Sequence, residues 1–262
     1  MWIAKPLPLY LGWQTYQHFN RFISERVPYF LLTKRYRVNM KVAIVGANGK
    51  VGRLVCNKLK ECKSFATPLA LVRTEEQVDH FEREVGIEAS LTSIEDSNVG
   101  QIAAALKGCD AVVFSAGAGG KGVERIFTVD LDGCVKTIEA CEIAGIKRFI
   151  VVSAINAEDR EFWWNTALRN YYIAKRTADH EVKNSKLDYT ILHPGSLMLG
   201  GGTGKLTPVA RVQETKKNHY AIQREDVASV IVESLLNPQK TIRKTIPLAN
   251  GEQPISEFIQ SL

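Results

Sequence analysis

Short apolar runs alternate with segments of helical periodicity along most of the chain. In the first pair, the four apolar residues 42–45 precede apolar positions 51, 54, 55 and 59, which share one face of a helix. Strands that alternate with helices form a parallel sheet covered on both faces, so we expect an α/β protein with a doubly wound parallel sheet. The same pattern predicts strands at 67–73, 88–91, 111–115, 149–153, 189–193 and 241–248, and helices at 75–85, 98–106, 131–144, 166–184, 225–236 and 255–260.

Three glycines, Gly46, Gly49 and Gly52, separate the first strand from the first helix. In such a unit the first glycine permits a tight turn, the second lets the backbone approach a pyrophosphate, and the third allows close helix packing. The start of the helix offers free N–H groups and a positive dipole end to the phosphates. A glycine-rich turn of another α/β protein is the alternative, but the flanking strand and helix favour a Rossmann-type dinucleotide site. Its expected residues are Gly46, Asn48, Gly49, Lys50, Val51, Gly52 and Arg53.

The end of the second predicted strand bears on the choice of cofactor. An NAD site usually has Asp or Glu there to bind the ribose hydroxyl, whereas an NADP site has an arginine that can bind the 2′-phosphate. This strand ends in Arg73, and Lys50 and Arg53 add positive charge near the glycine turn. Glu75 and Glu76 lie close enough to keep NAD open, and Arg73 could instead be a solvated surface residue. We expect NADP, with NAD as the alternative.

A tyrosine and a lysine four residues apart, Tyr171 and Lys175, lie in the predicted helix 166–184. This spacing places both on one helical face, whereas Tyr172 points about 100° away. An ammonium beside a phenol lowers the phenol pKa, so Tyr171 can exchange a proton with a carbonyl or alcohol while a hydride moves to or from nicotinamide. The pattern alone is weak, but Ser153 precedes it at the carboxyl end of a strand, where such sheets bind ligands. We expect Ser153 to hydrogen-bond the reacting oxygen.

The distribution of charge argues against a nucleic-acid-binding protein. The formal net charge of the 262 residues is +6, but the first 39 residues hold six Lys or Arg against one Glu. The rest of the chain is therefore close to neutral. Five cysteines without a CxxC pair indicate reduced, mostly packed thiols in an intracellular compartment. No run approaches about 18 apolar residues, so we expect no integral membrane segment.

The first 39 residues also differ in their aromatic content, because they hold nine aromatic residues and the other 223 hold thirteen. A basic, acid-poor segment fits mitochondrial targeting, but it contains only one serine, Ser24. A membrane-surface or partner-binding arm and a true start at Met40 are the alternatives. We favour Met40. Residues 1–39 would then be a leader, 40–262 the dinucleotide-binding domain, and the cytoplasm the expected compartment, with mitochondria as the alternative if the leader is a real targeting segment.

Together these motifs resemble those of the atypical short-chain dehydrogenase/reductase family, in its NAD(P)-binding NmrA-like branch, and especially uncharacterised fungal members. The resemblance covers about residues 40–262 and rests on GANGKVG, LVR, VVFSAGAGG, TVDLDG, VVSAINAEDR, YYIAK, HPGSL and REDVA. It supports the cofactor roles of the glycine turn and Arg73. It further implies that the ribose side of the cofactor is lined by Ser115, Ala116 and Gly117. Lys175 would hold the nicotinamide ribose, and the ring would be bordered by His193, Pro194 and Gly195.

Two positions depart from the family pattern. Asp130 stands where the full active-site set has Asn, and an ionised carboxylate cannot donate hydrogen bonds as Asn does. His193 stands where Arg is common before Pro-Gly, and a structural role closing the strand is as good an interpretation as a substrate contact. The candidate catalytic set is therefore Tyr171, Lys175 and Ser153, with Asp130 included. About 70 residues follow the sixth strand, which predicts a small C-terminal cap after about residue 194.

Three functions fit these features. Each of them implies a small-molecule ligand, and none of them predicts the oligomeric state. The first is an NADP-dependent oxidoreductase acting on a small carbonyl or alcohol. The second is a dinucleotide-sensing protein without turnover, which the serine, tyrosine and lysine set disfavours and Asp130 mildly favours. The third is an NAD(P)-dependent epimerase or dehydratase, against which the small cap counts. Fold class alone does not separate them.

Overall fold

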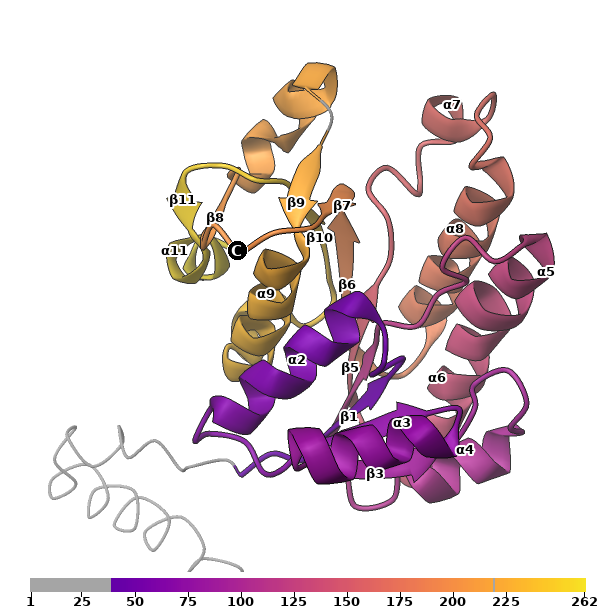
Figure 1. Ribbon diagram of the computed structural model, residues 1–262. Helices are drawn as coiled ribbons and strands as arrows, with labels where there is room; N and C mark the ends of the chain where they lie inside the picture. The colour runs from indigo at the N-terminus through magenta and orange to yellow at the C-terminus, as the bar shows by residue number, and fades with distance from the viewer. Residues whose placement is uncertain (1–38, 219) are drawn as a thin grey trace, which may run out of the picture. The chain divides into compact units, whose positions relative to one another are not determined.

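Seven strands form the central sheet of the protein (Figure 1). They are β1 (Val42–Val45), β2 (Leu69–Val72), β3 (Glu88–Leu91), β4 (Ala111–Phe114), β5 (Arg148–Val152), β6 (Asp188–Pro194) and β10 (Lys244–Leu248). Their order is β10-β6-β5-β4-β1-β2-β3, and every neighbouring pair is parallel. The computed structural model describes residues 39–218 and 220–262. The expected doubly wound parallel sheet is confirmed.

The strand order reverses between β1 and β4. From β1 the chain proceeds outward to β2 and β3, then returns to β4 on the other side of β1 and continues outward to β5, β6 and β10. The loops that follow β1 and β4 therefore diverge at the carboxyl edge of the sheet. Open α/β sheets bind their ligands in the crevice at this reversal.

Helices cover both faces of the sheet (Figure 1). One face carries α2 (Lys50–Glu61), α9 (Arg224–Leu236) and α11 (Ile255–Gln260), and the other carries α4 (Val99–Ala105), α6 (Asp132–Ala144) and α8 (Arg169–Asn184). The remaining helical segments are α3 (Glu75–Asp79), η2 (His80–Val85), α5 (Val123–Arg125), η3 (Ile126–Leu131), α7 (Arg160–Trp163), η4 (Val209–Asn218) and α10 (Pro238–Thr241).

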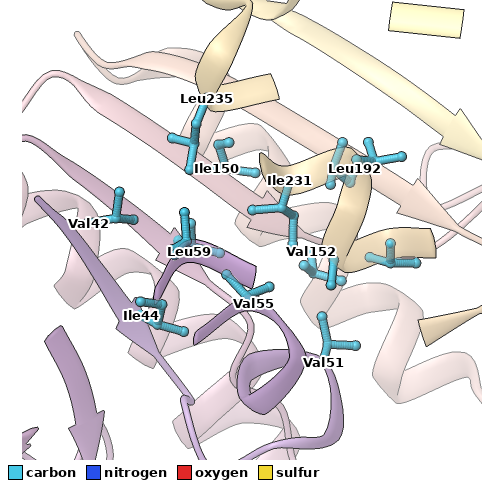
Figure 2. Packing of buried hydrophobic residues seen from close by; sticks show 14 of the residues in the cluster. Val42, Ile44, Val51, Val55, Leu59, Ile150, Val152, Leu192, Ile231 and Leu235 are labelled. Carbon is cyan, nitrogen blue, oxygen red and sulfur yellow. The ribbon is translucent and has the colours of Figure 1, made fainter. Parts of the chain in front are cut away.

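Alternate side chains of each central strand enter opposite hydrophobic layers. Val42 and Ile44 of β1 pack with α2 and α9, whereas Ala43 and Val45 pack with α4, α6 and α8. Figure 2 shows the first layer, where Val42 and Ile44 lie near Leu59 of α2. A strand that is buried on both sides needs apolar residues at every position, which is why β1 is the unbroken run VAIV.

The C-terminal region adds two small sheets at the edge of the domain. β7 (Ser196–Met198) pairs in parallel with β9 (Ala221–Gln223), and β8 (Lys205–Leu206) pairs in antiparallel with β11 (Gln253–Pro254). The glycine-rich loop between them is held by two carboxylates. Glu225 accepts a hydrogen bond from the Gly202 N–H (2.8 Å), and Asp226 accepts one from the Gly204 N–H (2.8 Å). Strands of two or three residues have too little periodicity for the sequence to predict them.

The helical structure before α6 was not predicted in full. The predicted helix 131–144 corresponds to α6, but helical turns begin earlier, at Val123, and run through α5 and η3. The six residues of η3 form a wide π-type turn that carries Asp130, and such insertions interrupt the 3.6-residue periodicity. The short helix α7 was also missed, and the predicted helix 166–184 begins only at Arg169.

The start of the last strand was predicted wrongly. Thr241 closes the short helix α10, and β10 begins only at Lys244. The Thr241 hydroxyl is buried, where it donates to the Ser234 carbonyl (3.0 Å) and accepts from the Arg148 guanidinium (3.1 Å). These contacts come from other elements, so the β-branched character of Thr241 did not reveal them.

The cysteines are unpaired, and four of the five are buried. Burial raises the pKa of the Cys56 and Cys134 thiols to about 12 and that of Cys109 to about 11. Thiols of this kind stay protonated near neutral pH and are poor nucleophiles. In residues 39–218 and 220–262, no helix is long and apolar enough to cross a membrane.

The predicted leader 1–39 lies outside the described residues except for its last residue. Met40 forms a parallel bridge with Phe65, and its carbonyl accepts a hydrogen bond from the Ala66 N–H (3.0 Å). A chain that starts at Met40 therefore keeps its first sheet contacts. We expect this shortened chain to match the full chain in melting temperature and in NADPH affinity, measured by calorimetry. A large loss of either would mean that the leader packs on the domain.

Candidate active site

A cavity of about 730 Å³ lies at the strand-order reversal, along the carboxyl ends of β1, β2 and β4. The glycine turn forms its floor, and α2 begins there after the N-cap residue Gly49. No side chain of the described residues caps the first turn of α2, and this turn holds no acidic residue. The free N–H groups and the positive end of the helix dipole therefore suit a phosphate, which is the fit expected for a dinucleotide pyrophosphate.

Two of the glycines are required by close backbone contacts. Gly46 has a φ of +81°, and a Cβ there would lie 2.6 Å from the backbone of Ala116 in the loop after β4. A Cβ on Gly52 would lie 2.3 Å from the Gly46 carbonyl oxygen and 2.8 Å from the Ala47 Cα. The turn after β1 is thus pressed between α2 and the loop after β4, and only glycine fits at both points.

Gly52→Ala should disrupt this turn. Because the new methyl group meets backbone atoms, which cannot rotate away, we expect a loss of about 1–3 kcal/mol in the free energy of unfolding together with weaker NADPH binding. Gly100→Ala in α4 is the matched control, since its Cβ would come no closer than 3.4 Å to the Asn98 side chain. Urea unfolding and calorimetric titration test both variants. Equal behaviour of the two would contradict the proposed tight turn.

Most of the predicted cofactor residues line this cavity. They are Gly46, Asn48, Gly49, Lys50, Val51, Arg73, Ser115, Ala116 and Gly117. Gly52 acts instead through packing. Arg53 turns to a neighbouring hollow, where its guanidinium donates to the Asn48 side chain (3.0 Å) and contacts His80 Nε2 at 3.2 Å.

Arg73 lies exposed at the rim of the cavity. Within the described residues its guanidinium has no hydrogen-bond or ion-pair partner, while its backbone N–H donates to Gln77 Oε1 (3.2 Å). Thr74 caps α3, so Glu75 and Glu76 stand in the first turn of that helix and are exposed. A free guanidinium at this rim can bind a 2′-phosphate. Both carboxylates have a structural role instead, because acidic side chains in the first turn of a helix interact favourably with the positive end of its dipole.

The sequence reasoning missed several residues of the same cavity. The loop after β3 contributes Thr92, Ser93, Ile94 and Glu95, and the opposite side contributes Lys121, Arg125, Leu197 and Arg224. Arg125 is neutralised by Glu95, to which it donates two hydrogen bonds of 2.9 and 2.7 Å. Lys121 belongs to the glycine-rich loop after β4, and the glycines on either side of it are the signal in the sequence that marks this position.

A second cavity, of about 560 Å³, adjoins the first, because Leu197 and Arg224 line both. Its walls include Ser153, Tyr171, Pro194 and Gly195, together with Ala154, Ile155, Phe162, Thr166, Leu168, Tyr172, Ser196 and Tyr220. Ser153 is 4% exposed, and its hydroxyl has no hydrogen-bond partner in the described part of the chain. A buried hydroxyl without a partner is costly, so this one is well placed to bind a ligand oxygen.

Tyr172 also lines the second cavity, which the helical spacing did not predict. Its ring stacks on that of Trp163 in α7, with the two planes 2° apart and the centroids separated by 5.9 Å. Through this stacking, α7 holds the Tyr172 ring in the wall of the second cavity. Even so, Tyr171 and not Tyr172 is the tyrosine whose phenol affects the pKa of Lys175.

Lys175 is 2% exposed and lines neither cavity. Its ammonium donates to the Val152 carbonyl (2.9 Å) and lies 3.7 Å from an Asp130 oxygen. Burial opposes the charge, but the neighbouring Tyr171, Asp130 and Asp179 outweigh it, and the pKa of Lys175 is raised. Lys175 is therefore a permanent cation that joins η3, the end of β5 and α8.

Asp130 is a structural carboxylate in this arrangement. It is 2% exposed, and its second oxygen accepts a hydrogen bond from the Ala118 N–H (2.8 Å). It thereby anchors the loop after β4, which borders the first cavity. Its place in the candidate catalytic set is better described as positioning, since it lines neither cavity.

The pKa of Tyr171 is raised above its ordinary value, which corrects the expectation of a net lowering. Burial is the largest cause, and the charges of Asp130 and Asp179 add to it, so the opposing effect of Lys175 is outweighed. Sequence spacing revealed the lysine but not the two carboxylates. The phenol therefore keeps its proton at neutral pH and is ready to donate it.

His193 closes β6 as a structural residue. It is 3% exposed, its Nε2 lies 2.8 Å from Asp179 of α8, and it lines neither cavity. The interpretation of His193 as a neighbour of the nicotinamide ring therefore finds no support in its position. The adjoining Pro194 and Gly195 do line the second cavity.

Comparisons with known proteins agree with this geometry. Residues 46–238 match the NAD(P)H-binding family. The chain is 65% identical over 224 residues to the UPF0659 protein YMR090W of Saccharomyces cerevisiae, covering 85% of this chain and 99% of that one. It is 42% identical to a Bacillus subtilis protein named as the uncharacterized sugar epimerase YhfK, covering 85% and 100%. The solved structure of the oxidoreductase ylbE from Lactococcus lactis is 33% identical, with a TM-score of 0.74 and coverage of 85% and 96%.

The family match extends well beyond the glycine turn. It runs from Gly46 to Pro238 and includes five of the seven strands of the sheet and nearly all residues that line the two cavities. The family's ligand is a nicotinamide dinucleotide, which suits the uncapped helix start and the glycine turn described above. The chain belongs to the NAD(P)H-binding family of Rossmann-type proteins.

Proposed function

We propose that the protein is an NADP(H)-dependent oxidoreductase that interconverts a small carbonyl compound and its alcohol. The observation that carries this proposal is the second cavity, where the unpartnered Ser153 hydroxyl and the Tyr171 phenol share a wall. It adjoins the dinucleotide cavity through Leu197 and Arg224. A carbonyl group in the second cavity would therefore lie beside the nicotinamide end of a bound cofactor.

The residues of this chain divide the work of the reaction. When bound, nicotinamide supplies or accepts the hydride. Ser153 donates a hydrogen bond to the carbonyl oxygen and polarises it. Tyr171 gives its proton to the same oxygen as negative charge develops there. Lys175 stays charged beside the phenol and stabilises the phenolate that remains, while Asp130 keeps the loop after β4 in place.

Purification of the protein followed by identification of any bound nucleotide is the first test. A screen of aldehydes, ketones and alcohols, read by the absorbance of NADPH, then tests for turnover. We expect NADPH-dependent reduction of at least one carbonyl. Tight NADPH binding without turnover of any carbonyl or alcohol would favour the sensing protein instead.

The name of the Bacillus subtilis relative supports one further candidate, an epimerase that uses its nucleotide transiently. Such an enzyme would convert its substrate without net consumption of NADPH, so product analysis by NMR distinguishes it from a reductase. The small size of the second cavity, about 560 Å³, and the short cap favour the reductase.

A further inference from the structure

Among the described residues, the second cavity is lined by a single charged one. Of the fourteen described residues that line it, Arg224 is the only one with a charge, and none is acidic. Its other walls are mostly apolar or aromatic and include Phe162, Leu168 and Tyr220. A cation that faces a cavity whose other described walls carry no charge attracts an anion, because no carboxylate there offsets it.

Arg224 lacks a partner for this charge in the described part of the chain. Its Nη1 atom is buried without a hydrogen bond, and no carboxylate forms an ion pair with the side chain. The adjacent Glu225 and Asp226 do not neutralise it, because they bind Lys58 and the glycine-rich loop 202–204. Arg148 of β5 shows the contrast, since its two terminal nitrogens donate four hydrogen bonds to protein oxygens and only its Nε lacks a partner among the described residues.

Two further groups of the cavity are unpartnered and more deeply buried. Tyr220 is 6% exposed and Ser153 is 4% exposed, and neither hydroxyl has a hydrogen-bond partner within the described residues. Three polar groups without partners thus border one small cavity with apolar walls. Buried polar groups are normally paired, so this arrangement indicates a ligand with oxygen atoms at more than one end.

We propose that Arg224 binds a carboxylate of the substrate, and that the substrate is a carbonyl compound with one carboxylate on an apolar or aromatic body. This inference rests on the proposed function for the role of Ser153 and Tyr171 at the carbonyl end. A single guanidinium matches a single negative charge and can bind both oxygens of a carboxylate. The phosphates of the dinucleotide already have the uncapped start of α2, so Arg224 remains available to the substrate.

The test compares two aldehydes that differ only in charge, 4-formylbenzoate and its methyl ester. Each is titrated by calorimetry into the full chain saturated with NADP⁺, a state in which the aldehyde cannot be reduced. We expect the carboxylate to bind at least about tenfold more tightly than the ester, the usual effect of one charge-assisted hydrogen bond. Arg224→Gln should reduce this ratio to within about twofold while leaving the affinity for NADP⁺ within about threefold.

Two control variants complete the experiment. Arg224→Lys keeps the charge and should retain part of the preference, and it decides the matter if Arg224→Gln fails to fold. Arg211→Gln removes an exposed arginine that pairs with Glu214 and lines neither cavity, so it should leave the ratio unchanged.

Three results would overturn the assignment: no binding of either aldehyde, equal binding of both by the unmodified protein, or a tenfold loss of NADP⁺ affinity in Arg224→Gln with the carboxylate preference intact. The last would assign Arg224 to the cofactor phosphates. A carboxylate preference that depends on Arg224, found without any reduction by NADPH, would support the substrate class and contradict the oxidoreductase.

Discussion

Tyr171→Phe should lower turnover by about 10²- to 10⁴-fold and leave the affinity for NADPH unchanged, because it removes the proton that the carbonyl oxygen receives in the transition state. The ring itself stays in the wall of the second cavity, so the shape of the site is preserved. Single-turnover kinetics with NADPH and any reduced carbonyl, together with calorimetric titration of NADPH, measure the two quantities. The raised pKa of Tyr171 adds a pH dependence: reduction is supported at neutral pH, where the phenol is protonated, and is lost as pH rises through the pKa of the folded protein.

Tyr172→Phe is the matched control, since Tyr172 lines the same cavity but interacts with Trp163 through its ring, which phenylalanine retains. We expect its turnover to stay within a few-fold of the unmodified protein. A fully active Tyr171→Phe beside an inactive Tyr172→Phe would overturn the assignment of the proton donor.

Lys175→Ala should damage cofactor binding and turnover together. It removes a buried cation and leaves Asp130 without it, and breaking a buried ion pair in this way costs about 3–5 kcal/mol of stability. Its melting temperature must therefore be measured before its kinetics are interpreted.

Arg73→Glu should weaken NADPH binding by about 10- to 100-fold, corresponding to the loss of about 1.5–3 kcal/mol from a charged hydrogen bond, with additional repulsion of the 2′-phosphate. The affinity for NADH should change little, because that cofactor has no phosphate at this position. Titration calorimetry with both cofactors measures the shift in preference.

Arg83→Glu makes the same change in net charge on the neighbouring segment η2, where Arg83 pairs with Asp79 (3.1 Å) and does not line the dinucleotide cavity. It should leave both affinities nearly unchanged. If the unmodified protein binds NADH as tightly as NADPH, the proposed preference for NADP is wrong, and Arg73 is a solvated surface residue.

Local patterns were sufficient to predict most of the sheet, because its central strands are buried on both faces, whereas the edge strand β3 is partly exposed. β1, β4 and β5 are continuous apolar runs for this reason, and their approximate positions followed directly from the sequence. The glycine turn was equally readable, since the nearest contacts of Gly49 and Gly52 lie within a single strand–turn–helix unit, although Gly46 also meets the backbone of Ala116 after β4. Most of the floor of the dinucleotide cavity was therefore predictable from one short segment.

The chemistry of the second cavity depended on residues that are distant in sequence. The pKa of Tyr171 is raised chiefly by burial in the folded protein; Lys175 on its own helix opposes the rise, and Asp130, which η3 brings to Lys175, adds to it. The sequence left two roles open for His193, a structural one and a substrate contact. The structure favours the structural role, because Asp179 of α8 lies 2.8 Å from its Nε2. Electrostatic effects sum over every nearby charge, so a motif that contains only one of the partners cannot give even the direction of the shift.

The sequence alone therefore determined the doubly wound sheet, the glycine turn and the pairing of Tyr171 with Lys175, because these depend on residues within a few turns of one another. Only the tertiary structure decided which polar groups lack partners. Ser153 follows β5, Tyr220 precedes β9 and Arg224 begins α9, and their unpaired atoms become evident once these segments border a common cavity. Hydrogen-bond satisfaction is a property of the packed molecule, which is why the proposed carboxylate site at Arg224 could not be predicted from the sequence.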